Sequence, residues 1–181
     1  MKKLHLLRHA KSDWTDPVAR DFDRPINKRG RLGARLMGQY LQQERLNFDQ
    51  VIASPALRVA ETIDEVSRAY GKRLEPTWER RIYLASSASL LDILREVDDQ
   101  ILSLLLVGHN PGMEDLILDL VPETDGDGFR SAVCEKYPTA TLAVIEMDID
   151  HWRDAGSGLG RLSRFIRPRD LDPQLGPEDE D

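Results

Sequence analysis

The chain has 181 residues, with 25 Lys and Arg against 32 Asp and Glu, and a formal net charge of −7. That length fits one domain, which at this size buries ~70% of its unfolded surface. The negative balance argues against a general nucleic-acid-binding protein, because such proteins need a basic face. The single cysteine, Cys134, excludes an intrachain disulfide and suits a reducing compartment. No apolar run is long enough for a signal peptide or a membrane span, so we expect a cytoplasmic protein whose partner is neither a membrane nor a nucleic acid.

Strand-like and helix-like patterns alternate along the chain. In chain order, the sequence predicts strands over residues 3–7, 49–54, 73–76, 103–107, 141–147 and 162–166. Helical patterns lie between them and are opened by Asn27, by the Ser54–Pro55 pair and by Ser89 as capping residues. A further apolar helix face covers residues 113–121, and residues 122–138 are predicted to form a long loop at the rim of the site.

The order of these elements predicts an α/β fold with three layers, in which a mainly parallel central sheet carries helices on both faces. Residues 103–107 are apolar without interruption, as expected for a central strand that is buried on both faces. We expect one domain over residues 1–168. Residues 169–181 are acidic and nearly free of apolar side chains, which predicts a disordered tail.

Three predicted strands end in side chains that suit an anion. Arg8 and His9 follow the first strand, Arg58 lies just beyond the second, and His109 follows the strand over residues 103–107. Open α/β sheets bind ligands at the carboxyl ends of their strands, so we expect these side chains to meet there. A neutral His9 is a good nucleophile toward phosphorus, and a guanidinium group can bind two phosphate oxygens at once through parallel hydrogen bonds. Backbone amides after His109, and a protonated His109, would add to a phosphate pocket.

Arg58 has two interpretations. It lies in the first turn of a predicted helix, where the positive end of the helix dipole disfavours a cation unless an anion lies nearby. It either binds phosphate or pairs with Glu61 or Glu65 one turn later.

The other two strand ends also allow structural interpretations. Arg8 either binds phosphate or pairs with Asp13 or Asp23 beside a buried His9. His109 is either a site residue or a histidine that completes a turn.

Other phosphate chemistries lack their motifs. Cys134 has Ala140 six positions later, where a cysteine phosphatase needs arginine. Asp148 and Asp150 mimic the aspartate pair of haloacid-dehalogenase-type phosphatases, but Trp152 stands where that pattern needs threonine or valine. No P-loop motif is present. His5 precedes His9 by four positions in a strand without a carboxylate or cysteine cluster, so His5 is expected to be structural and no metal or other cofactor is expected.

The three strand-end motifs together resemble the histidine phosphatase superfamily, which includes phosphoglycerate mutase and acid phosphatases. The motifs are Leu6-Leu7-Arg8-His9-Ala10-Lys11-Ser12, Ser54-Pro55-Ala56-Leu57-Arg58-Val59-Ala60-Glu61-Thr62 and Val107-Gly108-His109-Asn110-Pro111. The short length and the segment Asp23-Arg24-Pro25-Ile26-Asn27-Lys28-Arg29-Gly30 look most like the phosphohistidine phosphatase (SixA-like) branch. The resemblance covers nearly all of residues 4–147 and implies a phosphoglycerate mutase-like fold.

The resemblance also implies roles for individual residues. His9 matches the nucleophile that becomes phosphorylated, Arg8 and Arg58 match the two phosphate-binding arginines, and His109 matches the second histidine of the pocket. Ser12 and Asn110 match positions that often contact phosphate or line the pocket.

The sequence departs from the wider superfamily at two places. Ala10 follows the nucleophile where the larger superfamily usually has glycine, although the SixA-like branch tolerates alanine. The nearest match to an acidic proton donor is Glu79, which equally fits a surface residue paired with Arg80 or Arg81, and we favour that pairing.

The resemblance therefore implies a metal-independent phosphatase that forms a phosphohistidine intermediate and releases inorganic phosphate. Its expected substrate is phosphohistidine on a protein. The alternatives are small phosphomonoesters, or a module that binds phosphate or a phosphopeptide without turnover.

Overall fold

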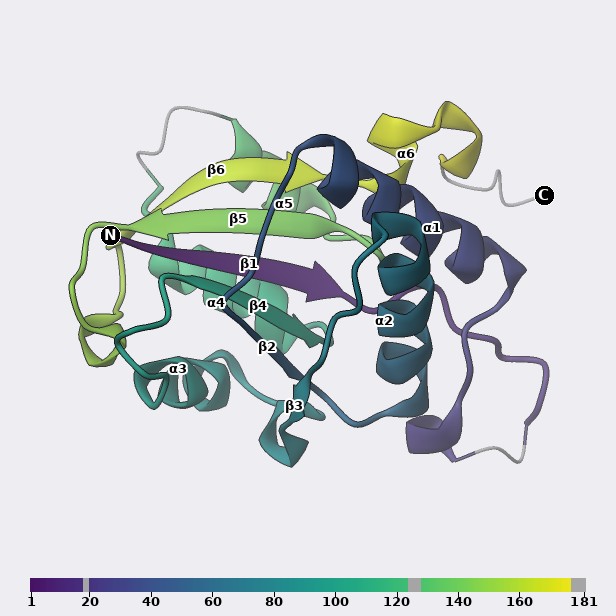
Figure 1. Ribbon diagram of the computed structural model, residues 1–181, viewed down its shortest axis with the longest axis horizontal. Coiled ribbons are helices and arrows are strands. Elements are labelled where there is room, and N and C mark those ends of the chain that lie inside the picture. Colours follow the sequence, from purple (N-terminus) through teal and green to yellow (C-terminus); the bar gives the residue numbers. More distant parts are fainter. Residues whose placement is uncertain (18–19, 124–127, 177–181) are drawn as a thin grey trace.

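A six-stranded sheet with the strand order β3-β2-β4-β1-β5-β6 forms the middle of the molecule (Figure 1). The computed structural model describes residues 1–17, 20–123 and 128–176. The strands are β1 (Lys2–Arg8), β2 (Gln50–Ala53), β3 (Thr77–Trp78), β4 (Ser103–Gly108), β5 (Leu142–Met147) and β6 (Gly160–Ile166). The four strands β3, β2, β4 and β1 pair in parallel, whereas β5 runs antiparallel to both β1 and β6. The prediction of a mainly parallel sheet is confirmed.

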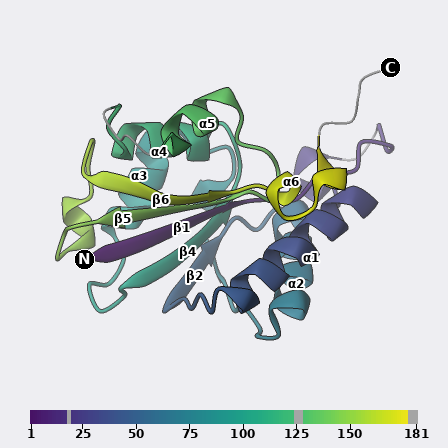
Figure 2. The same cartoon turned by 90° about the horizontal axis from the view of Figure 1, so that it is seen from above.

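Helices cover both faces of this sheet. They are α1 (Lys28–Gln43), α2 (Leu57–Tyr70), α3 (Ser87–Arg95), α4 (Gly112–Leu120), α5 (Phe129–Glu135) and α6 (Pro168–Leu171). Figure 2 shows α1 and α2 on one side of the sheet and α3, α4 and α5 on the other, with α6 beside α1. The predicted three-layer α/β architecture is therefore confirmed.

Alternate residues of the central strand feed two hydrophobic cores. Leu104 and Leu106 of β4 pack with the core that contains α3 and α4, whereas Leu105 and Val107 pack with the core that contains α1 and α2. All four side chains are fully buried, which explains why this strand carries no polar residue between Leu104 and Val107. Each such burial stabilises the fold by ~1.5–3 kcal/mol, so the carboxyl end of β4 is firmly anchored.

The predicted helix starts are correct for α1 and shifted for α3. Asn27 caps α1, because its side chain accepts the Gly30 N–H at 2.8 Å. The cap of α3 is Ser86 rather than Ser89, and the Ser86 hydroxyl accepts the Ser89 N–H at 3.2 Å. Both serines have the capping chemistry, and the sequence pattern does not distinguish them.

The prediction that Ser54 caps α2 is wrong. The helix begins at Leu57, two residues later than predicted. Ser54 still belongs to the sheet edge, because its N–H donates to the carbonyl of Val107 at 3.1 Å, and its hydroxyl lies 2.7 Å from His109 Nε2. Its hydroxyl thus contacts His109 across the sheet edge, and it also accepts the Ala56 N–H at 3.4 Å just before the helix begins.

Two segments that were predicted to be irregular contain helices. The predicted loop over residues 122–138 contains α5, whose Val133 is fully buried in the core. The predicted tail begins with α6, where Pro168 occupies the first helical position and is buried, and continues into a 3-10 turn over Pro173–Leu175. Leu171 packs against the α1 side, so residues 169–176 belong to the folded domain. Residues 124–127 and 177–181 lie outside the described residues. The predicted edge strand over residues 73–76 is also displaced, to β3.

Candidate active site

The carboxyl ends of β1, β2 and β4 meet at one edge of the sheet (Figure 1). Beyond β1, the His9 N–H donates to the Gly108 carbonyl at 3.0 Å, which ties the loop after β1 to the end of β4. The rings of His9 and His109 lie with their centroids 5.2 Å apart. The structure therefore brings these two histidines together, as the strand-end argument predicted.

His9 is held in one orientation by the residue that follows it. Its Nδ1 lies 2.7 Å from the carbonyl oxygen of Ala10. Because a carbonyl oxygen only accepts, Nδ1 carries the proton and Nε2 keeps its lone pair. Burial lowers the pKa of His9 to about 3. The hydrogen bond to Ala10 opposes this shift, whereas His109, Arg8 and Arg58 add to it. The ring is thus neutral at neutral pH, as a nucleophile must be.

His109 faces the same space from the end of β4. Its Nε2 lies 2.7 Å from the Ser54 hydroxyl, and its Nδ1 is buried without a hydrogen-bond partner in the described part of the chain. Burial first, and then the charge of Arg58, lower the pKa of His109 to about 4. The His109 ring is therefore neutral at neutral pH in the ligand-free protein.

Arg8 lies at the last position of β1. Its Nη1 donates to the Tyr137 carbonyl oxygen at 2.6 Å, while its Nε is buried and has no partner within the described residues. Burial lowers the pKa of Arg8, yet a guanidinium remains charged in proteins. Among the described residues no ion pair joins Arg8 to Asp13 or Asp23, so that structural alternative is wrong. An unsatisfied buried donor beside His9 is a position where an anion is stabilised.

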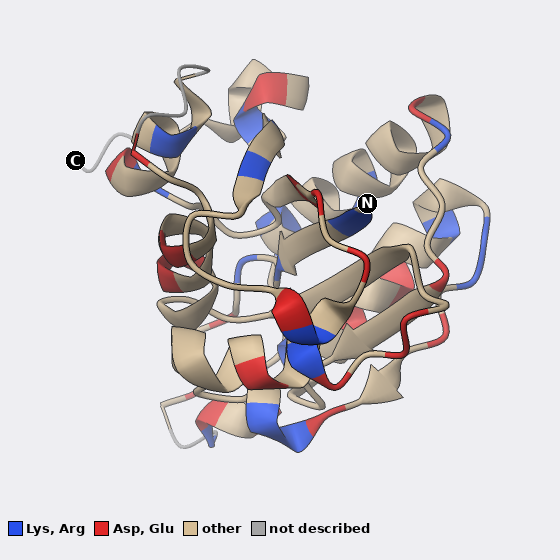
Figure 3. Cartoon of the chain, turned by 90° about the vertical axis from the view of Figure 1, so that its left-hand side faces the viewer, with Lys and Arg blue, Asp and Glu red and all other residues tan. Residues whose placement is uncertain are grey.

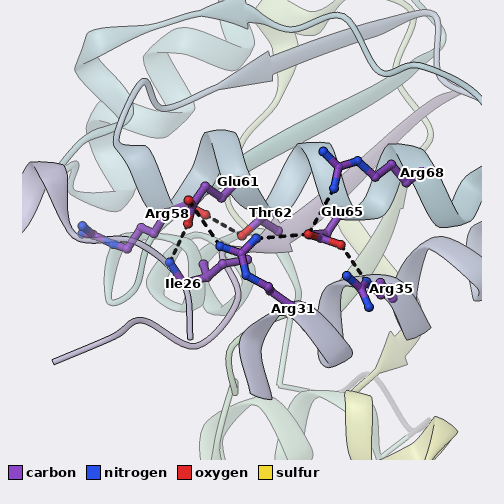
Figure 4. Close-up of polar contacts among 8 residues, drawn as sticks. All are labelled: Ile26, Arg31, Arg35, Arg58, Glu61, Thr62, Glu65 and Arg68. Carbon is purple, nitrogen blue, oxygen red and sulfur yellow. Dashed lines mark hydrogen bonds and ion pairs between the residues drawn. The ribbon is translucent and has the colours of Figure 1, made fainter. Parts of the chain in front are cut away.

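Arg58 reaches the site from the first turn of α2 and is only 6% exposed. It does not pair with Glu61 or Glu65. Figure 4 shows the Arg58 side chain extending away from these two carboxylates, which lie toward α1. There Glu61 accepts the Ile26 N–H at 2.7 Å, and Glu65 binds arginine side chains of both helices. The structural alternative for Arg58 is therefore wrong.

Three residues that the sequence did not identify as site residues complete the site. Asp21 accepts from Arg58 through its backbone carbonyl at 2.6 Å and through its carboxylate at 3.1 Å. Tyr83 donates its hydroxyl to the same carboxylate at 2.7 Å, and its ring centroid lies 5.5 Å from that of His109. Thr62 accepts the Ala10 N–H at 2.9 Å and donates to the Arg58 carbonyl at 2.6 Å. Thr62 lies within the second motif, whereas Asp21 lies in a 3-10 turn (Asp21–Asp23) of a segment without any recognisable sequence pattern.

Ser12 follows His9 by three positions, and Asn110 follows His109 directly. Ser12 is buried and forms an isolated antiparallel bridge with Ile26. The Asn110 amide donates to Glu114 at 2.9 Å and to the Tyr137 carbonyl at 3.3 Å, while its buried oxygen has no partner in the described part of the chain. Asn110 and Arg8 thus share the Tyr137 carbonyl oxygen.

Glu79 lies at the carboxyl end of β2, because its N–H donates to the Ala53 carbonyl at 2.8 Å. Its carboxylate accepts from the Arg81 guanidinium at 2.9 Å and from the Arg81 N–H at 2.9 Å. The hydrogen bond from Arg81 holds the pKa of Glu79 below its ordinary value, so the carboxyl group is ionised at neutral pH. The pairing with Arg81 that the sequence favoured is present.

His5 lies on β1, away from the carboxyl edge, and its Nδ1 donates to the Leu104 carbonyl at 3.2 Å. Burial lowers the pKa of His5 to about 4, and the ring packs edge-on against Phe48. His5 is structural, as expected. Within residues 1–17, 20–123 and 128–176, no group of three or more His, Cys, Asp or Glu is arranged to hold a metal ion. In the same part of the chain, every helix is too short or too polar to cross a bilayer.

Several known proteins resemble this chain in sequence and in fold. A family model of the histidine phosphatase superfamily (branch 1) matches residues 4–82, which include Arg8, His9 and Arg58. An uncharacterized protein of Mycobacterium tuberculosis is 32% identical over 164 residues, which cover 90% of this chain and all of that protein. A phosphohistidine phosphatase SixA homolog of Haemophilus influenzae is 26% identical over 154 residues, which cover 80% of this chain and 88% of that protein.

Among solved structures, one from Agrobacterium tumefaciens that is provisionally assigned as the phosphohistidine phosphatase SixA superposes with a TM-score of 0.77. It is 29% identical and covers 92% of this chain and 98% of that chain. The fold, the paired histidines and these matches define the class: the chain belongs to the histidine phosphatase superfamily and is a phosphatase that acts on phosphorylated substrates. Within the superfamily it is a member of the SixA-like branch.

Proposed function

We propose that this phosphatase removes the phosphoryl group from phosphohistidine on another protein, and that His9 is its nucleophile. The observation that carries the proposal is the 2.7 Å hydrogen bond from His9 Nδ1 to the Ala10 carbonyl. It leaves the Nε2 lone pair available, and it stabilises the positive charge that the ring acquires when Nε2 bonds to phosphorus.

The reaction takes place in two displacements. His9 Nε2 attacks phosphorus in line on a substrate ring whose other nitrogen carries a proton. The bond from phosphorus to the substrate nitrogen breaks with its electron pair remaining on that nitrogen, which releases a neutral imidazole. Arg8 and Arg58 hold the transferring oxygens and stabilise the charge that is spread over them. Water then attacks phosphorylated His9, which releases inorganic phosphate and restores the imidazole.

His109 and Asn110 serve as further partners of the phosphoryl group. The free Nδ1 of His109 and its link to Ser54 allow the ring to take up a proton when a phosphate dianion enters. A dianion favours the protonated form, which raises the pKa of His109 from its low value in the ligand-free protein. Ser12 lines the pocket from the loop after His9.

The state of Glu79 supports phosphohistidine over a phosphoester. A phosphoester releases an alkoxide, which needs a proton from an acid, whereas the imidazole released by phosphohistidine is a better leaving group. Glu79 is ionised and bound by Arg81, so it is a poor acid at neutral pH. An enzyme without a strong proton donor suits a labile phosphorus–nitrogen bond.

The shape of the chain supports a protein substrate. The connections that follow β1, β2 and β4 contain no inserted domain within the described residues. Enzymes for small molecules usually bury most of their ligand. An open edge is accessible to a phosphorylated side chain on the surface of another protein.

A substrate panel tests the proposal. We expect kcat/KM for a protein domain phosphorylated on histidine to exceed that for p-nitrophenyl phosphate and for a phosphotyrosine peptide by about tenfold or more. His9→Ala should abolish turnover of all three, while His151→Gln, which changes an exposed histidine away from the site, serves as the matched control. Equal or faster turnover of the phosphoesters would assign the enzyme to small phosphomonoesters. Phosphate binding without any turnover would favour a binding module.

A further inference from the structure

A cavity that Arg8 shares in lining opens toward α1 and α6. Its volume is about 510 Å³, and it lies between the start of α1, residues 136–140 and the segment from Arg167 to Gly176. Figure 2 shows α6 and the start of α1 side by side at this end of the sheet. Six of its lining residues are basic, namely Arg8, Lys11, Arg29, Lys136, Arg167 and Arg169. We call this cavity the basic pocket.

The charge of the basic pocket is only partly compensated. Asp170 binds Arg167 through two hydrogen bonds of 2.9 Å, and Glu135 also contributes an attraction to Arg167. Arg29 donates to the carbonyl oxygen of Gly176. Within the described residues the lining of the pocket contains six basic side chains and no carboxylate.

This local excess stands out because the chain as a whole is acidic, with a net charge of −7. Figure 3 shows basic and acidic segments interleaved over the side of the molecule that it presents. A concave surface that gathers six cations in an acidic protein attracts anions locally and repels them elsewhere, which favours an acidic partner in one orientation.

The basic pocket is continuous with the candidate active site through Arg8. That side chain lines the pocket, its Nη1 binds the Tyr137 carbonyl, and its buried Nε has no partner in the described part of the chain. Lys11 follows His9 by two positions and also lines the pocket. A ligand whose phosphoryl group lies at His9 can therefore extend past Arg8 and Lys11 into this cavity.

We infer that the basic pocket binds the acidic side chains that flank the phosphorylated residue of a protein substrate. The inference rests on the proposed function and adds the chemistry by which the substrate protein is selected. The cations extend from separate segments around an open cavity, so several carboxylates of one polypeptide can each pair with a different cation. Pro138, Pro168 and Leu175 line the same cavity and offer apolar surface to the methylene groups of bound glutamate side chains.

Direct binding tests the inference independently of turnover. The probes are two peptides that carry the same phosphonate analogue of phosphohistidine, with glutamates on both sides in one and glutamines in the other. By calorimetry, we expect the glutamate peptide to bind about tenfold more tightly at low salt, and we expect the difference to shrink as salt screens it. In a variant with Lys136→Glu and Arg169→Glu, the preference should disappear or reverse.

Arg73→Glu provides the matched control. Arg73 lies beyond the end of α2 opposite to Arg58, and its side chain is 86% exposed. The same reversal of charge there should leave the preference for the glutamate peptide in place. Equal binding of both peptides by the wild-type chain would overturn the inference, and so would a preference that Lys136→Glu and Arg169→Glu leave unchanged.

Two other occupants are distinguished by further arms of the experiment. If fructose 1,6-bisphosphate binds more tightly than the glutamate peptide, and loses affinity in the same double variant, the pocket serves a small polyanion and the inference is wrong.

Four carboxylates, at positions 178–181, follow Gly176 in the sequence. A second variant is truncated after Gly176. If only this variant prefers the glutamate peptide, and the full chain does not, the pocket of the full chain is occupied by its own carboxylates and the inference is overturned. A failure of the substrate panel with an intact glutamate preference would instead contradict the proposed function.

Discussion

Asp21 holds Arg58 at two points, through a carbonyl hydrogen bond of 2.6 Å and a carboxylate contact of 3.1 Å. Burial opposes ionisation of this carboxyl group, but the hydrogen bond from Tyr83 and the charge of Arg58 together hold the pKa of Asp21 below its ordinary value. The ligand-free protein therefore places a negative charge on the arginine that we propose binds phosphate. An incoming phosphoryl group must share Arg58 with that charge.

Asp21→Asn should strengthen the binding of inorganic phosphate. Asparagine keeps an oxygen that accepts from Arg58 and Tyr83, but it removes a like charge whose repulsion at a few ångströms is worth ~1 kcal/mol, or about fivefold in affinity. The measurement is the inhibition constant of phosphate against p-nitrophenyl phosphate. Asp23→Asn, in the same 3-10 turn, is the control and should change the constant little. An unchanged or weaker inhibition by phosphate in Asp21→Asn would refute this role for the carboxylate.

Thr62 is a positioning residue, because its hydroxyl joins the loop of His9 to the helix of Arg58. Thr62→Val keeps the shape of the side chain but leaves the buried Ala10 N–H without a partner, which costs ~1–3 kcal/mol of folding stability. We expect kcat to fall about tenfold with a smaller change in KM, because a displaced nucleophile affects the transition state more than binding.

Thr62→Ser keeps both hydrogen bonds and is the matched control. It should retain most of kcat while losing some stability through the missing methyl group. If Thr62→Ser and Thr62→Val lower kcat equally, the hydroxyl has no positioning role and the residue only fills space.

The buried histidines predict that acid destabilises the protein. Burial lowers the pKa of His5 and of His109 from 6.5 to about 4, and that of His9 to about 3. In the unfolded chain these rings take up protons near pH 6.5, whereas in the folded chain they resist protonation until pH 4 or below. The unfolded state therefore binds more protons in this window, and stability decreases as the pH falls from 6.5 toward 4.

Urea unfolding measures this effect. The free energy of unfolding should be smaller at about pH 5 than at about pH 7.5 by several kcal/mol, since each unit of pKa shift corresponds to ~1.4 kcal/mol. Saturating phosphate should reduce the difference, because it binds only the folded state and favours protonation of the rings beside it. A midpoint that does not change between these pH values would contradict the neutral, buried state of the three rings.

The meeting of the site residues at the strand ends was predictable from the sequence, because it depends on two simple features. The apolar run before Gly108 requires a strand that is buried on both faces, and parallel strands of one sheet deliver their carboxyl ends to the same edge. His9, His109 and Arg58 could therefore be placed together before any coordinates were considered. The neutral state of His109 could not be predicted, because it depends on how deeply the ring is buried.

The residues that the sequence did not reveal come from segments without periodicity. Asp21 lies in a 3-10 turn whose position depends on its bonds to Arg58 and Tyr83, which join parts of the chain far apart in sequence. Ser54 has the chemistry of a helix cap, and only the position of His109 shows that its hydroxyl is used across the sheet edge. The helix α6 escaped prediction because its few apolar contacts are made with distant residues of the α1 side.

The most direct test of the central claim is to trap the phosphorylated enzyme. Wild-type protein is mixed with phosphorylated substrate, quenched in alkali within one turnover, digested and analysed by mass spectrometry, since phosphohistidine survives alkali and is lost in acid. The account predicts one acid-labile phosphoryl group on the peptide that contains His9, and none on that peptide in His9→Ala, which should also be inactive. A phosphoryl group on another residue, or a His9→Ala protein that still turns over substrate at a near-normal rate, would contradict it.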